Sequence, residues 1–279
     1  MAAAEGTVNV VLPAERGDIL DRNGEPLADS VDWLMVVADP QQTVDDAPEI
    51  ARSLAQRLSV DYIDTLARLR ERGSRFEYIA RRVPSTLAND VIAEAKGRGI
   101  KGLSTRRDPV RIYPAHDVAA NLLGFIGTDQ AFGGLEEAFD TYLSGTDGKA
   151  RYEVGGGNRI PLGTNEITKA VDGKDLTTTI DRDLQWYTQR VLRSAVLDAR
   201  GDSGVAVIMD SRTGEILADA DYPTYDAANP ADYPDTDRGA RTLSEPYEPG
   251  SVEKVLTLSS LIDAGRMTAR TKFTVPGSL

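Results

Sequence analysis

The sequence has 279 residues, of which 41% are hydrophobic and 27% are charged, as in soluble globular proteins of one or two domains. Its formal net charge of −12 argues against nucleic acid or an anionic membrane surface as the main partner, because both attract clustered lysine and arginine. The absence of cysteine excludes disulfides, thiolate metal sites and cysteine nucleophiles, and a lone histidine, His116, excludes zinc sites built from several histidines. The composition implies neither a metal nor an organic cofactor.

The sequence contains no run of about 18 apolar residues that could span a membrane. The first ten residues lack the basic and apolar regions of a signal peptide. Composition leaves two interpretations open, a cytoplasmic protein or a protein whose targeting segment lies upstream of this sequence.

The first third of the chain mixes extended segments with helices. Residues 8–30 are predicted to be extended around a tight turn at Asn23-Gly24, since both residues tolerate positive φ. Apolar residues at helical spacing predict two helices, and Ser85 is expected to cap a third. The predicted helices cover 45–60, 61–73 and 85–99, with a strand at 76–83.

The middle of the chain continues this α+β pattern. Residues 106–114 resemble a strand, and residues 116–127 a short buried helix. A further helix is predicted over 133–145 from a stripe of apolar residues four apart. Residues 151–163 are interrupted by glycine and are predicted to form a hairpin or an exposed connection. The helical stripe consists of Leu135, Phe139 and Leu143.

The pattern changes near residue 172, where we place the start of a second domain, so that the predicted domains are 1–171 and 172–279. A short strand precedes a long helix that Asp181 is expected to cap. A hairpin is predicted over 204–223, and its first strand, apolar at every position, is expected to be buried on both faces. The predicted apolar face of the long helix consists of Leu184, Tyr187, Val191 and Ala195.

The stretch YEPGSVEKVLTLSSLIDAG places Ser251 and Lys254 three residues apart at the start of a helix. Residues three apart lie on one helical face, so the lysine amine would approach the serine hydroxyl. An uncharged lysine can activate a serine nucleophile, and the helix N-terminus favours developing negative charge. The alternative is ordinary, a serine cap followed by a solvated lysine, and the motif alone does not decide between them.

The surrounding sequence resembles the class B penicillin-binding proteins. EPGSVEK follows a hairpin with Thr-Gly-Glu-Ile-Leu-Ala at 213–218 and a loop with Pro223, Tyr225, Asp226 and Asn229, as in the opening of the transpeptidase domain. ERGDILDRNGEPLADS resembles the Arg-Gly-x-Ile-x-Asp-Arg-Asn-Gly signature of these proteins. RIYPAHDVAANLLGFIG, GGLEEAFDTYLSGTDG and DLTTTIDRDLQ resemble further segments, in the family's order.

The resemblance implies a pedestal or dimerisation domain followed by the first part of a D,D-transpeptidase domain. Ser251 would be the acylated nucleophile and Lys254 its base. The implied partners are peptidoglycan stem peptides, β-lactams and other cell-wall synthesis proteins, and nucleic acid is not among them. The family's membrane anchor would lie upstream, on a protein that faces the outside of the cell membrane.

The sequence departs from the family in two respects. Neither Ser-x-Asn nor Lys-Thr/Ser-Gly follows Lys254, so we expect the chain to stop within the transpeptidase domain and to have little activity alone. Val252 and Glu253 replace the usual residues between serine and lysine, and an acid beside Lys254 would favour its charged form. The alternative functions are a non-catalytic scaffold for cell-wall proteins and a serine hydrolase of the β-lactamase kind, against which the long N-terminal region argues.

Several other residues invite a functional and a structural interpretation. The signature residues are read either as a partner contact or, as we favour, as a charge-bonded turn. Glu136 could be catalytic but is expected to cap or brace a helix, and His116 to start a helix or be buried. The acids Asp210, Glu215, Asp219 and Asp221 are expected to form a solvated edge rather than a metal site. The signature residues are Arg16, Gly17, Asp21, Arg22, Asn23, Gly24 and, further along the chain, Glu136.

Overall fold

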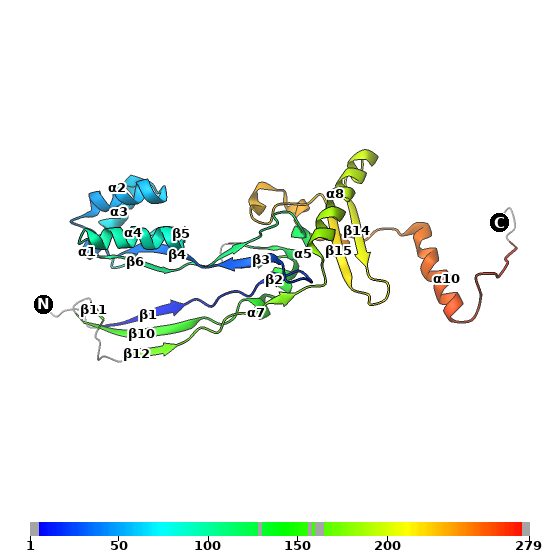
Figure 1. The fold of residues 1–279 in the computed structure, drawn as a ribbon, viewed down its shortest axis with the longest axis horizontal. Coiled ribbons are helices and arrows are strands. Elements are labelled where there is room, and N and C mark those ends of the chain that lie inside the picture. Colours follow the sequence, from blue (N-terminus) through cyan, green and yellow to red (C-terminus); the bar gives the residue numbers. More distant parts are fainter. Residues whose placement is uncertain (1–5, 128–129, 156–157, 160–164, 275–279) are drawn as a thin grey trace. The chain divides into compact units, whose positions relative to one another are not determined.

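The computed structural model of the protein describes residues 6–127, 130–155, 158–159 and 165–274 (Figure 1). The chain divides into two compact units, Met1–Thr242 and Leu243–Leu279. Helices and strands are mixed throughout the first unit, so the predicted α+β class is confirmed.

The strands β1, β2 and β3 belong to two different sheets. In one, β10 (Gly148–Gly155) pairs with β1 (Gly6–Leu12) on one side and with β11 (Asn158–Arg159) and β12 (Asn165–Thr168) on the other, all antiparallel. The predicted hairpin at 151–163 therefore forms where it falls within the described residues; residues 156–157 and 160–163 lie outside them.

The second sheet has the order β13-β2-β3-β7. The predicted turn at Asn23-Gly24 joins β2 to β3, and Gly24 has φ +86°, a conformation that glycine adopts without strain. A strand from the second predicted domain, β13, pairs with β2 in parallel. The strands are β2 (Ile19–Leu20), β3 (Pro26–Val31), β7 (Val110–Ile112) and β13 (Leu176–Thr177).

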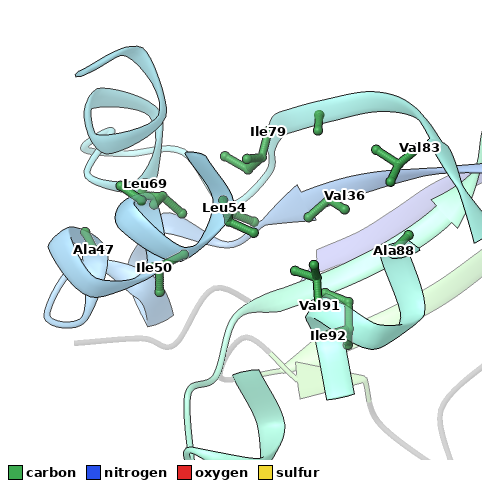
Figure 2. Packing of buried hydrophobic residues seen from close by; sticks show 13 residues of the cluster. Val36, Ala47, Ile50, Leu54, Leu69, Ile79, Val83, Ala88, Val91 and Ile92 are labelled. Carbon is green, nitrogen blue, oxygen red and sulfur yellow. The ribbon is translucent and has the colours of Figure 1, made fainter. Parts of the chain in front are cut away.

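A separate three-stranded sheet, β5-β4-β6, packs with helices to form what we call the head. Figure 2 shows its core, where apolar side chains from the helices meet those of β4 and β5. The three predicted helices are confirmed. The head consists of β4 (Trp33–Ala38), α1 (Pro40–Thr43), α2 (Ala47–Leu58), α3 (Tyr62–Leu69), β5 (Glu77–Pro84), α4 (Ser85–Gly97) and β6 (Leu103–Arg107).

Two head helices begin differently from each other. Asp61 caps α3, since its carboxylate accepts the N–H of Asp64 at 2.8 Å. The expectation that Ser85 caps α4 is wrong, because Pro84 occupies the cap position and Ser85 is already helical. The Ser85 hydroxyl instead donates to the carbonyl of Asp32, the residue before β4.

Three predicted elements are broken in the structure. The strand at 106–114 is divided between β6 and β7 at Asp108-Pro109, because proline lacks the N–H that a ladder needs. The helix at 116–127 shrinks to α5 (Ala120–Leu123), followed by β8 (Phe125–Ile126), which pairs with β9 (Ala131–Phe132). The helix at 133–145 becomes α6 (Gly134–Ala138) and α7 (Asp140–Leu143), separated by the exposed Phe139.

The long helix α8 (Arg182–Ala199) is capped by Asp181 as predicted, but its buried face is not the predicted one. Tyr187 and Val191 are exposed, while Gln185 and Gln189 are buried. Gln185 Oε1 accepts the N–H of Asp219 and Gln185 Nε2 donates to the carbonyl of Asp219, both at 2.7 Å. Amide side chains occupy this face because the surface opposite offers backbone polar groups that must be paired.

The predicted hairpin forms from β14 (Gly204–Met209) and β15 (Ile216–Tyr222). The expectation that β14 is buried on both faces is wrong, since Val205, Val207 and Met209 alternate outward and are exposed. The strand belongs to a two-stranded sheet, so the described residues cover only one of its faces. The remaining elements are η1 (Pro230–Asp232), η2 (Asp235–Asp237), α9 (Arg241–Ser244), η3 (Gly250–Val252) and α10 (Glu253–Asp263).

A second buried cluster lies where the β13-β2-β3-β7 sheet meets α5, α7 and the loop after β15. Its largest members include Ile19, Leu123, Leu143 and Tyr225. Among the helices that the structure describes, none has the length and apolar character needed to cross a membrane.

Replacing Leu54 with alanine is expected to lower the free energy of unfolding by about 2–5 kcal/mol, because the side chain is fully buried in the head core and its removal leaves a cavity. Urea unfolding followed by circular dichroism measures the change. Ile63→Ala, on the exposed face of α3, is the control and is expected to change stability by no more than about 0.5 kcal/mol. Equal losses for the two variants would contradict the assigned core.

Candidate active site

Ser251 and Lys254 lie together where the short η3 turn leads into α10. Lys254 Nζ donates to Ser251 Oγ over 3.1 Å. The predicted spacing therefore produces the expected proximity, and the catalytic role of the pair remains a prediction. A lysine amine at this distance can exchange a proton with the serine hydroxyl without any further movement of the backbone.

Gly250 shapes the entry to this turn. Its φ is +54°, in the left-handed region, and a Cβ built there would meet no heavy atom within 4 Å. The requirement for glycine is therefore one of backbone conformation rather than of space. Pro249, with φ −70°, precedes it, so the Pro-Gly pair directs the chain into the helix with the Ser251 side chain outward.

The described residues of the second unit leave this pair open to solvent. Ser251 and Lys254 are exposed, and so are the apolar side chains of Val252, Val255 and Leu256. Within residues 243–274, Glu253 forms no ion pair with Lys254. A lysine accepts a proton from a hydroxyl only when it is uncharged, and burial favours that form. Proton transfer from Ser251 to Lys254 therefore requires burial of the lysine, which residues 243–274 do not provide.

In the first unit, the carboxylate of Glu136 is fully buried between two arginines. Arg16 Nε donates to Glu136 Oε2 at 2.8 Å, and Arg111 Nε donates to Oε1 at 2.7 Å. Arg16 also donates to the backbone carbonyl of Glu136 and to Asp140, and the hydroxyl of Tyr113 donates to Oε1 at 3.3 Å. Glu136 thus braces α6 and does not cap it, since the cap position is Gly133.

Sequence reasoning missed Arg111, which supplies the second guanidinium group of this cluster. Its side chain is 4% exposed, and its Nη1 donates to the carbonyl of Gly17 and to Ser30 Oγ, both at 2.9 Å. An arginine between Val110 and Ile112 in a short strand was the only signal in the sequence. That signal does not identify the partner, because Glu136 lies 25 residues away in the chain.

Asp21 organises the turn between β2 and β3. Its carboxylate accepts the N–H groups of Asn23 at 2.7 Å, Glu25 at 2.9 Å and Arg182 at 3.2 Å. Burial opposes ionisation, but these bonds prevail and lower the pKa of Asp21 below its ordinary value. Because Arg182 is the first residue of α8, the same carboxylate connects the turn to the second predicted domain.

Two further signature residues also contact the region after residue 171. The N–H of Arg22 donates to the carbonyl of Ile180 at 2.8 Å, and its guanidinium lies 3.5 Å from Glu215. A Cβ on Gly17 would lie 2.2 Å from the carbonyl oxygen of Lys174, so only glycine permits this approach. These contacts support the structural interpretation of the signature.

Two expectations about other polar residues are wrong. His116 neither starts a helix nor is buried: it is exposed in a turn before α5, with φ +56° and its Nδ1 3.2 Å from Asp226 Oδ2. Asp219 and Asp221 do not form a solvated edge, since both are buried, with the segment around Arg241 and Thr242 beside their carboxyl groups. The alternation of β15 places both acids on the same face of the hairpin as Val205 and Val207, the face opposite to the one that α8 covers.

Burial and the charge of Asp219 raise the pKa of Asp221 from 3.8 to about 6. The folded state therefore holds this proton more tightly than the unfolded chain does. The resulting contribution to stability is present below about pH 4 and is lost as the pH rises through about 6.

The variant Asp221→Asn is expected to become more stable relative to the native protein as pH rises from 4 to 8, by about 2–3 kcal/mol, since the amide carries no charge. Urea unfolding at both pH values measures the difference. Asp232→Asn, at an exposed acid, serves as control and should show no such trend. A pH-independent effect of Asp221→Asn would refute the assignment.

Glu136→Gln is expected to lower the free energy of unfolding by about 3–5 kcal/mol, because the buried guanidinium of Arg111 and the half-buried one of Arg16 would lose their shared countercharge. Thermal and urea unfolding measure the loss, with the exposed Glu71→Gln as matched control. A loss below about 1 kcal/mol would mean that the cluster does not hold these segments together.

Models of two protein domain families match the chain, one in its N-terminal part and one in its C-terminal part. Residues 11–131 match the family model described as the penicillin-binding protein dimerisation domain, and residues 204–279 match that of the penicillin-binding protein transpeptidase domain. The peptidoglycan D,D-transpeptidase FtsI of Escherichia coli K12 is 34% identical over 90% of this chain and 43% of its own length. The chain spans about half the length of the curated relatives it matches.

Two solved structures resemble the fold. A peptidoglycan synthetase from Bifidobacterium adolescentis aligns with a TM-score of 0.71 and 30% identity, covering 98% of this chain and 54% of the other. The PBP2 of Helicobacter pylori, solved in complex with MreC, has a TM-score of 0.66 and 19% identity, over 95% of this chain and 55% of the other, and shows likeness of fold alone. With both domains matched in order, the chain belongs to the class B penicillin-binding proteins.

Proposed function

We propose that this chain supplies the acylated serine of a peptidoglycan D,D-transpeptidase. The observation that carries the proposal is the 3.1 Å distance between Lys254 Nζ and Ser251 Oγ at a helix start, in a chain of this family. The names of relatives such as FtsI support the reaction, and the family model covering residues 204–279 supports the domain.

In this reaction an uncharged Lys254 takes the Ser251 hydroxyl proton while Oγ attacks the carbonyl carbon of the D-Ala-D-Ala amide. The backbone N–H of Ser251 can donate to the oxyanion that forms. The amide C–N bond breaks, Lys254 returns the proton to the leaving D-alanine, and an acyl ester remains on Ser251. An amine from a neighbouring stem peptide then displaces the serine. β-Lactams would acylate the same oxygen.

The location and partners follow from this proposal. A cross-linking enzyme meets its stem peptides at the extracytoplasmic face of the membrane, with an anchor upstream of this chain. The net charge of −12 supports the expectation that nucleic acid is not a partner. The H. pylori complex with MreC supports a second candidate function, in which the pedestal binds other cell-wall synthesis proteins.

We also propose a domain boundary between residues 171 and 172. The two family models leave residues 132–203 between them, which brackets this position. The chain returns there from β12 toward β13, which pairs with β2 and precedes α8. Contacts across the boundary, including those of Asp21 and Gly17, keep the two sides in one compact unit.

Labelling with a fluorescent penicillin tests the transpeptidase proposal. We expect Ser251-dependent labelling of the full-length parent protein and almost none of residues 1–279 alone, because neither partner motif follows Lys254 here. Ser251→Ala should abolish the label, and Lys254→Ala should slow acylation about 10²–10⁴-fold.

Ser259→Ala, an exposed serine on the same helix, is the matched control and should label normally. A folded parent protein that stays unlabelled, or that labels equally with alanine at 251, would refute the enzymatic proposal.

A further inference from the structure

Positive charge gathers on one part of an otherwise acidic chain. Residues 68–82 contain six arginines and two glutamates, a local net charge of +4 in a chain of −12. All six basic residues are arginine rather than lysine. Arginine is favoured over lysine at protein interfaces, because its planar guanidinium group forms two hydrogen bonds to one carboxylate and stacks on aromatic rings.

Three of the six guanidinium groups are held by aspartates of the head. Arg68 binds Asp64 at 2.9 Å, Arg75 binds Asp39 at 2.8 Å and Arg81 binds Asp108 at 2.7 Å. These ion pairs show that arginines of this segment bind aspartate carboxylates, the same chemical group that an acidic ligand would offer. Two other side chains, those of Arg70 and Arg72, are exposed and form no ion pair with any residue that the structure describes.

An aromatic pair lies within the same segment. The rings of Phe76 and Tyr78 meet edge to face at 4.8 Å, and the guanidinium carbon of Arg106 on β6 lies 4.5 Å from the centre of the Phe76 ring. Tyr78 is 47% exposed. Arg68 fixes the strand beneath, since its Nη1 donates to the carbonyl of Tyr78 at 2.8 Å. The stacked arginine and half-exposed tyrosine are the side-chain types that dominate binding energy at interfaces.

We propose that this head arginine surface, defined as Arg70, Arg72, Phe76, Tyr78 and Arg106, binds an acidic segment of a partner protein. Carboxylates would bind the unpaired guanidinium groups, and an apolar side chain between them would pack on Tyr78. Within the segment only Glu71 and Glu77 oppose an acidic ligand, and they are outnumbered by Arg70, Arg72 and Arg106, which form no ion pair with any residue that the structure describes. The inference extends the partner-binding part of the proposed function and does not depend on chemistry at Ser251.

Fluorescence anisotropy tests the surface with a labelled peptide of repeated Glu-Glu-Leu, added to residues 1–279. We expect binding that weakens as salt rises and that is about tenfold or more weaker in the triple variant Arg70→Glu, Arg72→Glu, Arg106→Glu. The matched control reverses three exposed arginines elsewhere, Arg52→Glu, Arg151→Glu and Arg193→Glu, and is expected to bind as the native protein does. A thermal unfolding midpoint verifies that each variant folds, and Arg70→Ala with Arg72→Ala replaces the triple variant if it does not.

Three results would overturn the proposal: no binding of the peptide, equal weakening by both triple variants, or equal binding of a Gln-Gln-Leu peptide. Phosphatidylglycerol vesicles form a further arm, and binding to them without binding to the peptide would assign the surface to lipid and refute a protein partner. Penicillin labelling of Ser251 is measured separately, so failure of the catalytic proposal leaves the result of this experiment unchanged.

Discussion

The buried carboxylate of Glu136 is the constraint from which the packing of the pedestal follows. A charge removed from water must be paired, and here two guanidinium groups from Arg16 and Arg111 approach its two oxygens separately. Those arginines come from segments 120 and 25 residues away, so pairing them brings together the chain before β2, strand β7 and helix α6. Arg111 then extends the cluster to the carbonyl of Gly17, which packs against Lys174.

Directional polar contacts continue into the residues after the proposed domain boundary at 171–172. Asp21 reaches the first residue of α8, Arg22 reaches Ile180 and Glu215, and Gln185 of α8 reaches β15. Apolar packing alone could tolerate small shifts between these elements, whereas hydrogen bonds at 2.7–3.2 Å cannot. Polar groups therefore position the residues on the two sides of the proposed boundary against each other, and Met1–Thr242 form one compact unit.

Local signals explain which elements were predictable. Helices α2 and α3, the cap at Asp181 and the β14–β15 hairpin depend on residues close in sequence, and so does the distance from Ser251 to Lys254. The buried face of α8 was mispredicted because hydrophobic periodicity assumes an apolar interior, while Gln185 and Gln189 meet backbone groups there. The Arg111 contact, the burial of Asp221 and the broken helix at Phe139 depend on tertiary neighbours that no sequence window contains.

The way in which Gln185 contacts the hairpin has a consequence for divergence within the family. Its amide offers one donor and one acceptor, as a peptide group does, and both engage the main chain of residue 219. A contact made only with main-chain atoms does not depend on the side chain of the same residue. The Gln185 contact therefore places no requirement of its own on the side chain at position 219, whereas position 185 must remain an amide of the same length to hold the helix against the hairpin.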